Sequence, residues 1–101
     1  MTYPIYQIPE AEINILNALE WYASQRVGLD DDFLLSLEAE LNSILRNPFL
    51  YASLHKQTRR ALMARFPYAV FFIVEETEIL ILAVVHQRRK PSVWKMRKAK
   101  F

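Results

Sequence analysis

Two uninterrupted apolar runs in the second half of the chain constrain its fold more than any other feature. Ala69–Val74 has six residues and Ile79–Val85 has seven, whereas a helix that spans a membrane needs about 20. Runs of this length are typical of strands buried within a sheet. The acidic segment Glu75–Glu78 between them fits a tight turn. The sequence therefore predicts two antiparallel strands of a β-meander and no membrane partner.

A short strand followed by a helix is predicted at the N-terminus. Residues Thr2–Ile8 alternate as in a strand, and Pro4 favours the edge of a sheet because proline donates no ladder hydrogen bond. Pro9 fits the first position of a helix, and apolar residues then recur at helical spacing over about Glu10–Gln25. No positively charged stretch precedes an apolar core here, so we expect no targeting signal and a cytoplasmic protein.

A second helix is predicted after a very short connection. Gly28 is the only glycine of the chain, and it follows the first helix, where a left-handed residue without a Cβ suits a helix end. The acidic triplet Asp30–Asp32 favours the positive end of the next helix dipole. An apolar stripe then continues as far as Asn47, which precedes a proline. Two helices joined so closely favour an antiparallel hairpin.

The remaining segments complete an α+β domain. We predict a loop over Phe49–Thr58, a strand over Arg60–Phe66, and a short C-terminal helix that starts at Pro91 and is anchored by Trp94. The predicted order is β-α-α-β-β-β followed by the short helix. Because sheet faces must be buried, we expect the helical hairpin to cover one face of an antiparallel sheet. A chain of 101 residues suits a single domain over 1–101.

Charge is distributed unevenly along the chain. Residues 1–50 contain two basic and eight acidic side chains, whereas residues 51–101 contain eleven basic and three acidic ones. Clustered guanidinium groups bind phosphates and carboxylates through paired hydrogen bonds. The second half is therefore a candidate surface for an anionic macromolecule; the alternative is pairing with carboxylates of the same chain. The residues predicted to bind a protein partner or nucleic acid are Lys56, Arg59, Arg60, Arg65, Arg88, Arg89, Lys90 and Trp94.

The residue types present exclude several classes of site. The absence of cysteine excludes disulfides and thiolate sites, and two histidines cannot alone build a zinc site. A single glycine excludes the glycine-rich phosphate loops of nucleotide-binding proteins. We therefore expect no metal and no cofactor. His86, which ends the last predicted strand among arginines, is a candidate general acid or base; the alternative is a structural hydrogen bond.

Several short segments occur in a specific order: Ala18–Tyr22, Gly28-Leu29, Phe33-Leu34, Asn47-Pro48, Arg59–Ala61, Arg65–Tyr68, and Ala83–Pro91 followed by Trp94. Their order and spacing resemble the small toxins of the RelE/ParE superfamily, which are encoded beside an antitoxin. The resemblance spans most of the chain. It implies the growth-inhibiting toxin of a type II toxin–antitoxin module that stabilises a plasmid or chromosome. A cognate antitoxin would neutralise it and often co-represses its own operon, so operator DNA would be contacted only indirectly.

The superfamily includes two kinds of activity, because some members cleave mRNA on the ribosome whereas ParE-like members inhibit DNA gyrase. For the nucleases, the resemblance implies basic residues on the first meander strand and an arginine after the tyrosine that opens the next strand. It also implies an arginine after the last strand and a C-terminal tyrosine. Arg60 and Arg89 match two of these positions. However, Leu62 stands two residues beyond Arg60, Ala69 follows Tyr68, and the tail has no tyrosine.

These departures favour a ParE-like toxin that binds and inhibits DNA gyrase, and they disfavour an enzyme. Two alternatives stay open. The first is a ribosome-dependent mRNA endoribonuclease, for which His86, Arg65 and Arg89 are the candidate catalytic residues. The second is a degenerate family member that is not toxic and keeps its antitoxin contacts.

Overall fold

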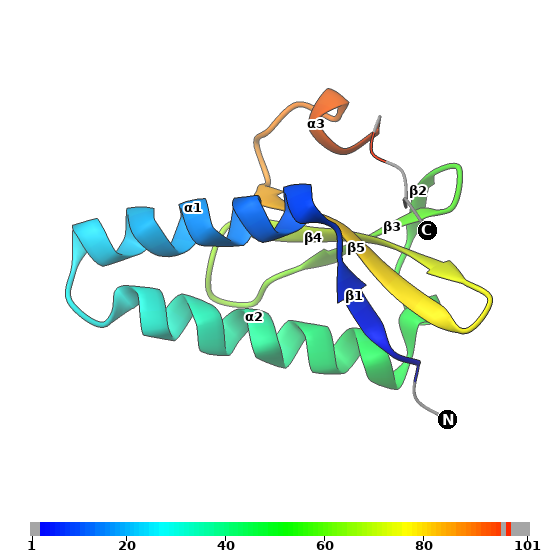
Figure 1. The fold of residues 1–101 in the computed structure, drawn as a ribbon, viewed down its shortest axis with the longest axis horizontal. Helices are drawn as coiled ribbons and strands as arrows, with labels where there is room; N and C mark the ends of the chain where they lie inside the picture. The colour runs from blue at the N-terminus through cyan, green and yellow to red at the C-terminus, as the bar shows by residue number, and fades with distance from the viewer. Residues whose placement is uncertain (1–2, 96, 98–101) are drawn as a thin grey trace.

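A computed structural model describes residues 3–95 and 97 and has an α+β fold (Figure 1). In chain order the elements are β1 (Ile5–Gln7), α1 (Pro9–Gln25), α2 (Leu29–Arg46), the 3-10 helix η1 (Pro48–Leu50), β2 (Ser53–His55), β3 (Thr58–Leu62), β4 (Tyr68–Glu75), β5 (Glu78–His86) and α3 (Ser92–Lys95). The predicted α+β class is confirmed, and so are the helical hairpin and the short C-terminal helix. The loop predicted over Phe49–Thr58 is wrong in part, because η1 overlaps its start and β2 lies within it.

Five strands form one mixed sheet in the order β1-β5-β4-β3-β2. Strands β2 to β5 pair as antiparallel neighbours. The predicted meander corresponds to β3, β4 and β5, and β2 adds a strand that was not predicted. The expectation of a wholly antiparallel sheet is corrected at β1, which pairs in parallel with β5 and sets Ile5 opposite Ile79. No tight turn joins these two strands, and the long connection through both helices permits a parallel pairing. β1 is an edge strand, as Pro4 indicated.

A β-bulge in β5 changes which residues face the helices. Phe72 pairs with Ile81, whereas the preceding Phe71 pairs with Ala83, so Leu82 is an extra residue in β5. Ile81 before the bulge and Val84 after it both belong to the core under the helices. Ala83 lies in a separate cluster on the other face. The bulge therefore shifts the alternation of the strand, so that Ile79 and Ile81 face the helices before it and Val84 faces them after it.

The helical hairpin covers one face of the sheet (Figure 1). Gly28, between the two helices, has φ of 86°, which is the left-handed conformation that the sequence predicted. Phe33 and Ile44 of α2 are completely buried and share a core with Ala18 of α1 and Phe72 of β4. The hydrophobic effect of this burial fixes the hairpin on the sheet.

The opposite face of the sheet carries a smaller apolar cluster beneath α3. Trp94 is only 5% exposed and packs with Phe71, Ala69 and Val85. The prediction that Trp94 anchors the tail is therefore confirmed. No helix in the described part of the chain is long and apolar enough to cross a membrane.

Strand β3 begins and ends earlier than predicted. It spans Thr58–Leu62 rather than Arg60–Phe66, because the chain turns tightly before β4. The amide of Met63 donates to the carbonyl of Tyr68 at 2.9 Å, and the amide of Tyr68 donates to the carbonyl of Phe66 at 2.7 Å. This turn brings the end of β3 and the start of β4 to the same end of the sheet as the last residue of β5, His86.

Candidate functional site

Strand β3 directs two neighbouring arginines to opposite faces of the sheet. Arg59 lies opposite Phe72, which belongs to the core under the helices, whereas Arg60 lies opposite Phe71 on the other face. The Nη1 atom of Arg59 donates a 2.6 Å hydrogen bond to the carbonyl oxygen of Tyr51. Arg60 is exposed. These two arginines therefore do not share one side of the sheet.

Four of the predicted residues lie in two adjoining loops at the end of the sheet where β5 finishes. The loop after β3 and the loop after β5 touch, because the amide of Gln87 donates to the carbonyl of Pro67 at 2.9 Å. All four side chains are exposed. We call these residues the loop group: Arg65, Arg88, Arg89 and Lys90.

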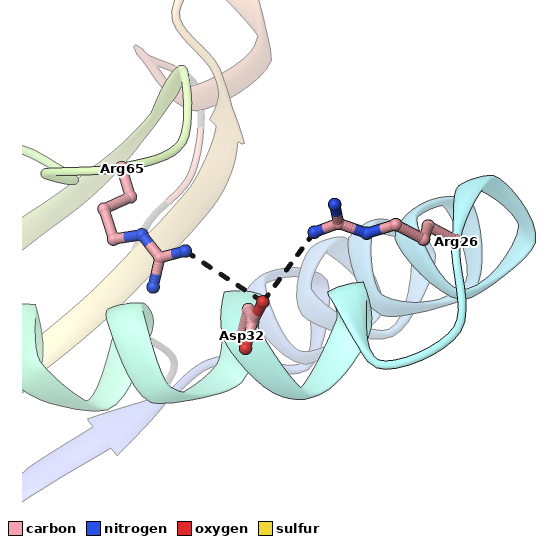
Figure 2. A network of polar contacts seen from close by, with 3 residues as sticks. All are labelled: Arg26, Asp32 and Arg65. Atoms are coloured by element: carbon pink, nitrogen blue, oxygen red, sulfur yellow. Dashed lines mark ion pairs between the residues drawn. The ribbon is translucent and has the colours of Figure 1, made fainter.

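One carboxylate of α2 lies between two guanidinium groups near the loop group. Oδ2 of Asp32 is 4.0 Å from Nη2 of Arg65 and 4.0 Å from Nη2 of Arg26, as Figure 2 shows. The side chains of the two arginines are 66% and 69% exposed, and exposed ion pairs contribute little free energy. Asp32 therefore offsets only part of the positive charge at this end of the molecule.

The other three predicted basic residues form the hairpin group, which consists of Lys56, Arg59 and Arg60. Lys56 occupies the turn between β2 and β3 with φ of 54°, and its carbonyl accepts a 3.0 Å hydrogen bond from Oγ of Ser53. This turn lies at the opposite end of β3 from the loop group. The structure thus separates the predicted basic residues into two groups. Trp94, the remaining predicted binding residue, is buried, so little of its side chain is available to a partner.

His86 has a structural contact at the end of β5. Its Nδ1 atom accepts a 3.1 Å hydrogen bond from the backbone amide of Arg88, and its ring lies 5.7 Å from the ring of Tyr68. The backbone amide of Arg89 donates to the carbonyl of His86 at 2.9 Å, but no side-chain hydrogen bond among the described residues joins His86 to Arg65 or Arg89. Of the three candidate catalytic residues of the nuclease alternative, His86 and Arg89 are therefore neighbours, whereas no hydrogen bond or ion pair in the described part of the chain joins Arg65 to either of them.

A small cavity of about 110 Å³ lies between α1 and the ends of β4 and β5. Its polar lining consists of Asn14, Asn17, Tyr68, His86 and Arg89. Burial raises the pKa of Tyr68, and the positive charge of Arg89 opposes this shift. The sequence reasoning named His86 and Arg89 but missed the other three residues.

One signal for the cavity was present in the sequence of α1. Ala11 and Ala18 are buried, and Asn14 lies between them at helical spacing, on the stripe that faces the sheet. A polar side chain at such a position needs hydrogen-bond partners. Oδ1 of Asn14 accepts a 3.3 Å hydrogen bond from the amide of Val84. That amide lies on the edge of β5 beyond the three residues that pair with β1.

Arg97 is a further residue that the sequence reasoning missed. Its Nη1 atom donates to Oδ1 of Asn14 at 2.7 Å and to the carbonyl oxygen of Leu82 at 2.9 Å. Burial lowers the pKa of Arg97, and the carboxylate of Glu10 partly opposes this shift. Arg97 therefore ties the C-terminal segment to α1 and to the edge of β5. No pattern in the sequence of the tail predicts this contact.

The face of the sheet opposite the helices is apolar along its middle. Leu62 of β3 lies directly opposite Ala69 of β4, and Ala69 is completely buried. Arg60 is the basic residue that β3 contributes to this face. No group of three or more metal-binding side chains gathers among the described residues. The arrangement therefore offers exposed cations for binding.

The comparison with protein families identifies the chain. A family model described as "ParE toxin of type II toxin-antitoxin system, parDE" matches residues 6–91. The chain belongs to the ParE toxin family. A solved structure described as "Chromosomal ParDE TA system from P. aeruginosa" is similar to this ParE-family chain, with a TM-score of 0.72 and 16% sequence identity. The similarity covers 84% of this chain and 96% of that chain, and at this identity it concerns the fold. No curated protein sequence matches the chain.

The region that matches the ParE family contains most of the candidate site. Residues 6–91 include both helices of the hairpin and the whole meander. The loop group lies inside this region, and so do the polar residues of the small cavity. Helix α3 and Arg97 follow it. The resemblance inferred from the sequence is thus confirmed for the ParE branch.

Proposed function

We propose that this ParE-family chain is a toxin that a cognate antitoxin neutralises, and that it acts in the cytoplasm by binding and inhibiting DNA gyrase. The choice of gyrase over mRNA as the target rests on Leu62 and Ala69, which pair across β3 and β4. In the nucleases, the resemblance implies arginine or another basic residue at these two positions. This chain has aliphatic side chains there. Such groups neither exchange protons nor stabilise a phosphate. An inhibitor that works by binding needs neither ability.

The exposed loop group supports a mechanism based on binding. Its four cations extend from two loops at one end of the sheet, and only Asp32 of α2 is in ion-pair range of Arg65 among the described residues. Positive charge concentrated in this way speeds encounter with an acidic protein surface, and the effect weakens as salt increases. We infer that the loop group contributes to the surface that contacts the target.

Apolar side chains on the helical hairpin support binding of an antitoxin. Four large ones are more than half exposed, although they lie on a well-packed domain. An antitoxin segment that lays a helix or a strand over the toxin would cover such groups. Its acidic residues would meet the basic side chains, and operator DNA would be reached through the antitoxin. The exposed side chains are Ile13, Leu16, Trp21 and Leu35.

Two assays with the purified chain test the proposed target. We expect it to inhibit supercoiling of relaxed plasmid by DNA gyrase and to leave mRNA intact in a translating lysate. Codon-linked mRNA cuts that disappear in H86A or R89A would overturn the gyrase proposal in favour of the nuclease. Normal growth after induction of the chain alone, together with intact supercoiling, would point to a degenerate family member.

A further inference from the structure

We propose that the 110 Å³ cavity between α1 and the ends of β4 and β5 is a pocket for one carboxylate group, supplied by an aspartate or glutamate side chain of the antitoxin. Its polar lining consists of Asn14, Asn17, Tyr68, His86 and Arg89. This inference rests on the proposed function for the identity of the partner. It goes further by naming the chemical group that is recognised and the residues that recognise it.

Contacts outside the cavity determine which polar atoms of two lining residues are available. Nδ1 of His86 accepts a hydrogen bond from the amide of Arg88, so the neutral ring carries its proton on Nε2. Oδ1 of Asn14 already accepts hydrogen bonds from the amide of Val84 and from Arg97. The remaining polar group of Asn14 is its NH₂, which can only donate. Both residues therefore present donors rather than acceptors.

The other three polar residues add donors whose acceptors are not found among residues 3–95 and 97. No hydrogen bond among the described residues involves the side chains of Asn17, Tyr68 or Arg89. Burial raises the pKa of Tyr68, so its hydroxyl keeps its proton at neutral pH and is able to donate. Arg89 supplies a permanent positive charge. The side-chain oxygens of Asn17 and Tyr68 can also accept, but a lining with donors on all five residues, one cation and no carboxylate is complementary to a single negative charge.

The size of the cavity favours a carboxylate over a phosphate of a nucleic acid. A carboxylate stands at the end of a short alkyl stem, so that one narrow entrance suffices. A phosphodiester instead carries a sugar on each side and needs a groove that is open at both ends. The rest of the lining comes from Ala18, Val84 and Val85, and these apolar residues suit the methylene groups of an acidic side chain.

Titration with two small anions tests the pocket without requiring an antitoxin. The side-chain NH signals of Asn14, Asn17 and Arg89 are followed by NMR while sodium acetate or sodium dimethyl phosphate replaces chloride at constant ionic strength. We expect acetate to shift these signals saturably and to bind more tightly than dimethyl phosphate. The R89Q variant should weaken acetate binding about tenfold and Y68F about threefold, since hydrogen bonds to charged groups are the stronger ones. The matched charge control is R46Q, at the end of α2, which should bind acetate like the wild type.

Each contrary outcome has a distinct meaning. Tighter binding of dimethyl phosphate would overturn the carboxylate assignment in favour of a nucleic-acid phosphate. Absence of saturable shifts with either anion, or equal acetate affinity in R89Q and R46Q, would overturn the pocket itself. A second measurement uses the antitoxin encoded in the neighbouring reading frame. If it binds the wild type and R89Q equally, the pocket inference fails and the proposed function survives. If it does not bind the wild type, the neutralisation proposal fails, whatever the acetate result.

Discussion

The indole of Trp94 stacks on the ring of Phe71, with ring centroids 4.4 Å apart and an angle of 15° between the planes. This contact attaches α3 to the face of the sheet that the helical hairpin leaves open. Phe71 is 5% exposed and belongs to a cluster with Ala69, Ala83 and Val85. Without the indole, this apolar patch would face water, so a short helix of four residues contributes to the stability of the whole domain.

The two tryptophans should therefore differ strongly in their effect on stability. We expect W94A to lower the free energy of unfolding by about 3 kcal/mol, because it removes a buried aromatic side chain. The matched control W21A removes a side chain that is 57% exposed and should cost less than about 1 kcal/mol. Urea denaturation of both variants at neutral pH measures the difference. Equal losses in the two variants would show that α3 does not pack as described.

Substitution of Gly28 should reveal the strain of a left-handed residue. Its φ is 86°, and no atom lies within 4 Å of an added Cβ, so conformation rather than crowding determines the cost. We expect G28A to lower the free energy of unfolding by about 1 kcal/mol. G28N should cost less, because asparagine tolerates this region better. If alanine proves as stable as glycine by thermal and urea denaturation, the connection between the helices adopts another conformation.

Alkaline pH should destabilise the fold through three partly buried tyrosines. Burial raises the pKa of Tyr22, Tyr51 and Tyr68 above the ordinary value of 10.0. The unfolded chain then loses these protons first, so their contribution to stability is complete below pH 10 and is lost as the pH rises through the folded-state pKa values. Urea denaturation from pH 8 to pH 11 should show this decrease, and the Y22F/Y68F double variant should reduce it. If the free energy of unfolding falls equally steeply with pH in the variant and the wild type, the decrease does not come from Tyr22 and Tyr68.

Reversing the charge of one arginine in either the loop group or the hairpin group should weaken the antitoxin complex. We expect R65E and R60E each to raise the dissociation constant about tenfold at low salt, and the effect to shrink as salt screens the charges. R46E, which makes the same charge change outside both groups, is the control. Isothermal titration at two salt concentrations measures the three variants. Wild-type affinity in R65E and R60E would exclude both basic groups from the antitoxin interface.

The fold was largely predictable because its main elements carry periodic or uninterrupted apolar patterns. Gly28 and Asn47-Pro48 marked the helix ends to within a residue or two. The three residues of β2 escaped prediction, because a segment this short has no measurable periodicity. The bulge at Leu82 was also hidden, since the run around it is apolar on both faces. The direction of β1 depends on tertiary packing rather than on its own residues.

The candidate site was predictable in residue type more than in arrangement. The sequence identified the basic loops and the missing nuclease positions, and the family comparison agrees with the ParE branch. It did not separate Arg59 from Arg60, because the predicted strand began only at Arg60 and left Arg59 outside it. Asn14 and Arg97 meet across 83 positions of the chain. A local pattern carries no information about contacts at such separation.

Supercoiling of relaxed plasmid by DNA gyrase, measured against increasing concentrations of the purified chain, tests the central claim most directly. We predict inhibition that saturates, that a stoichiometric amount of antitoxin reverses, and that R88Q/K90Q weakens. Gyrase that supercoils the plasmid at its normal rate in the presence of saturating wild-type chain would contradict the proposal.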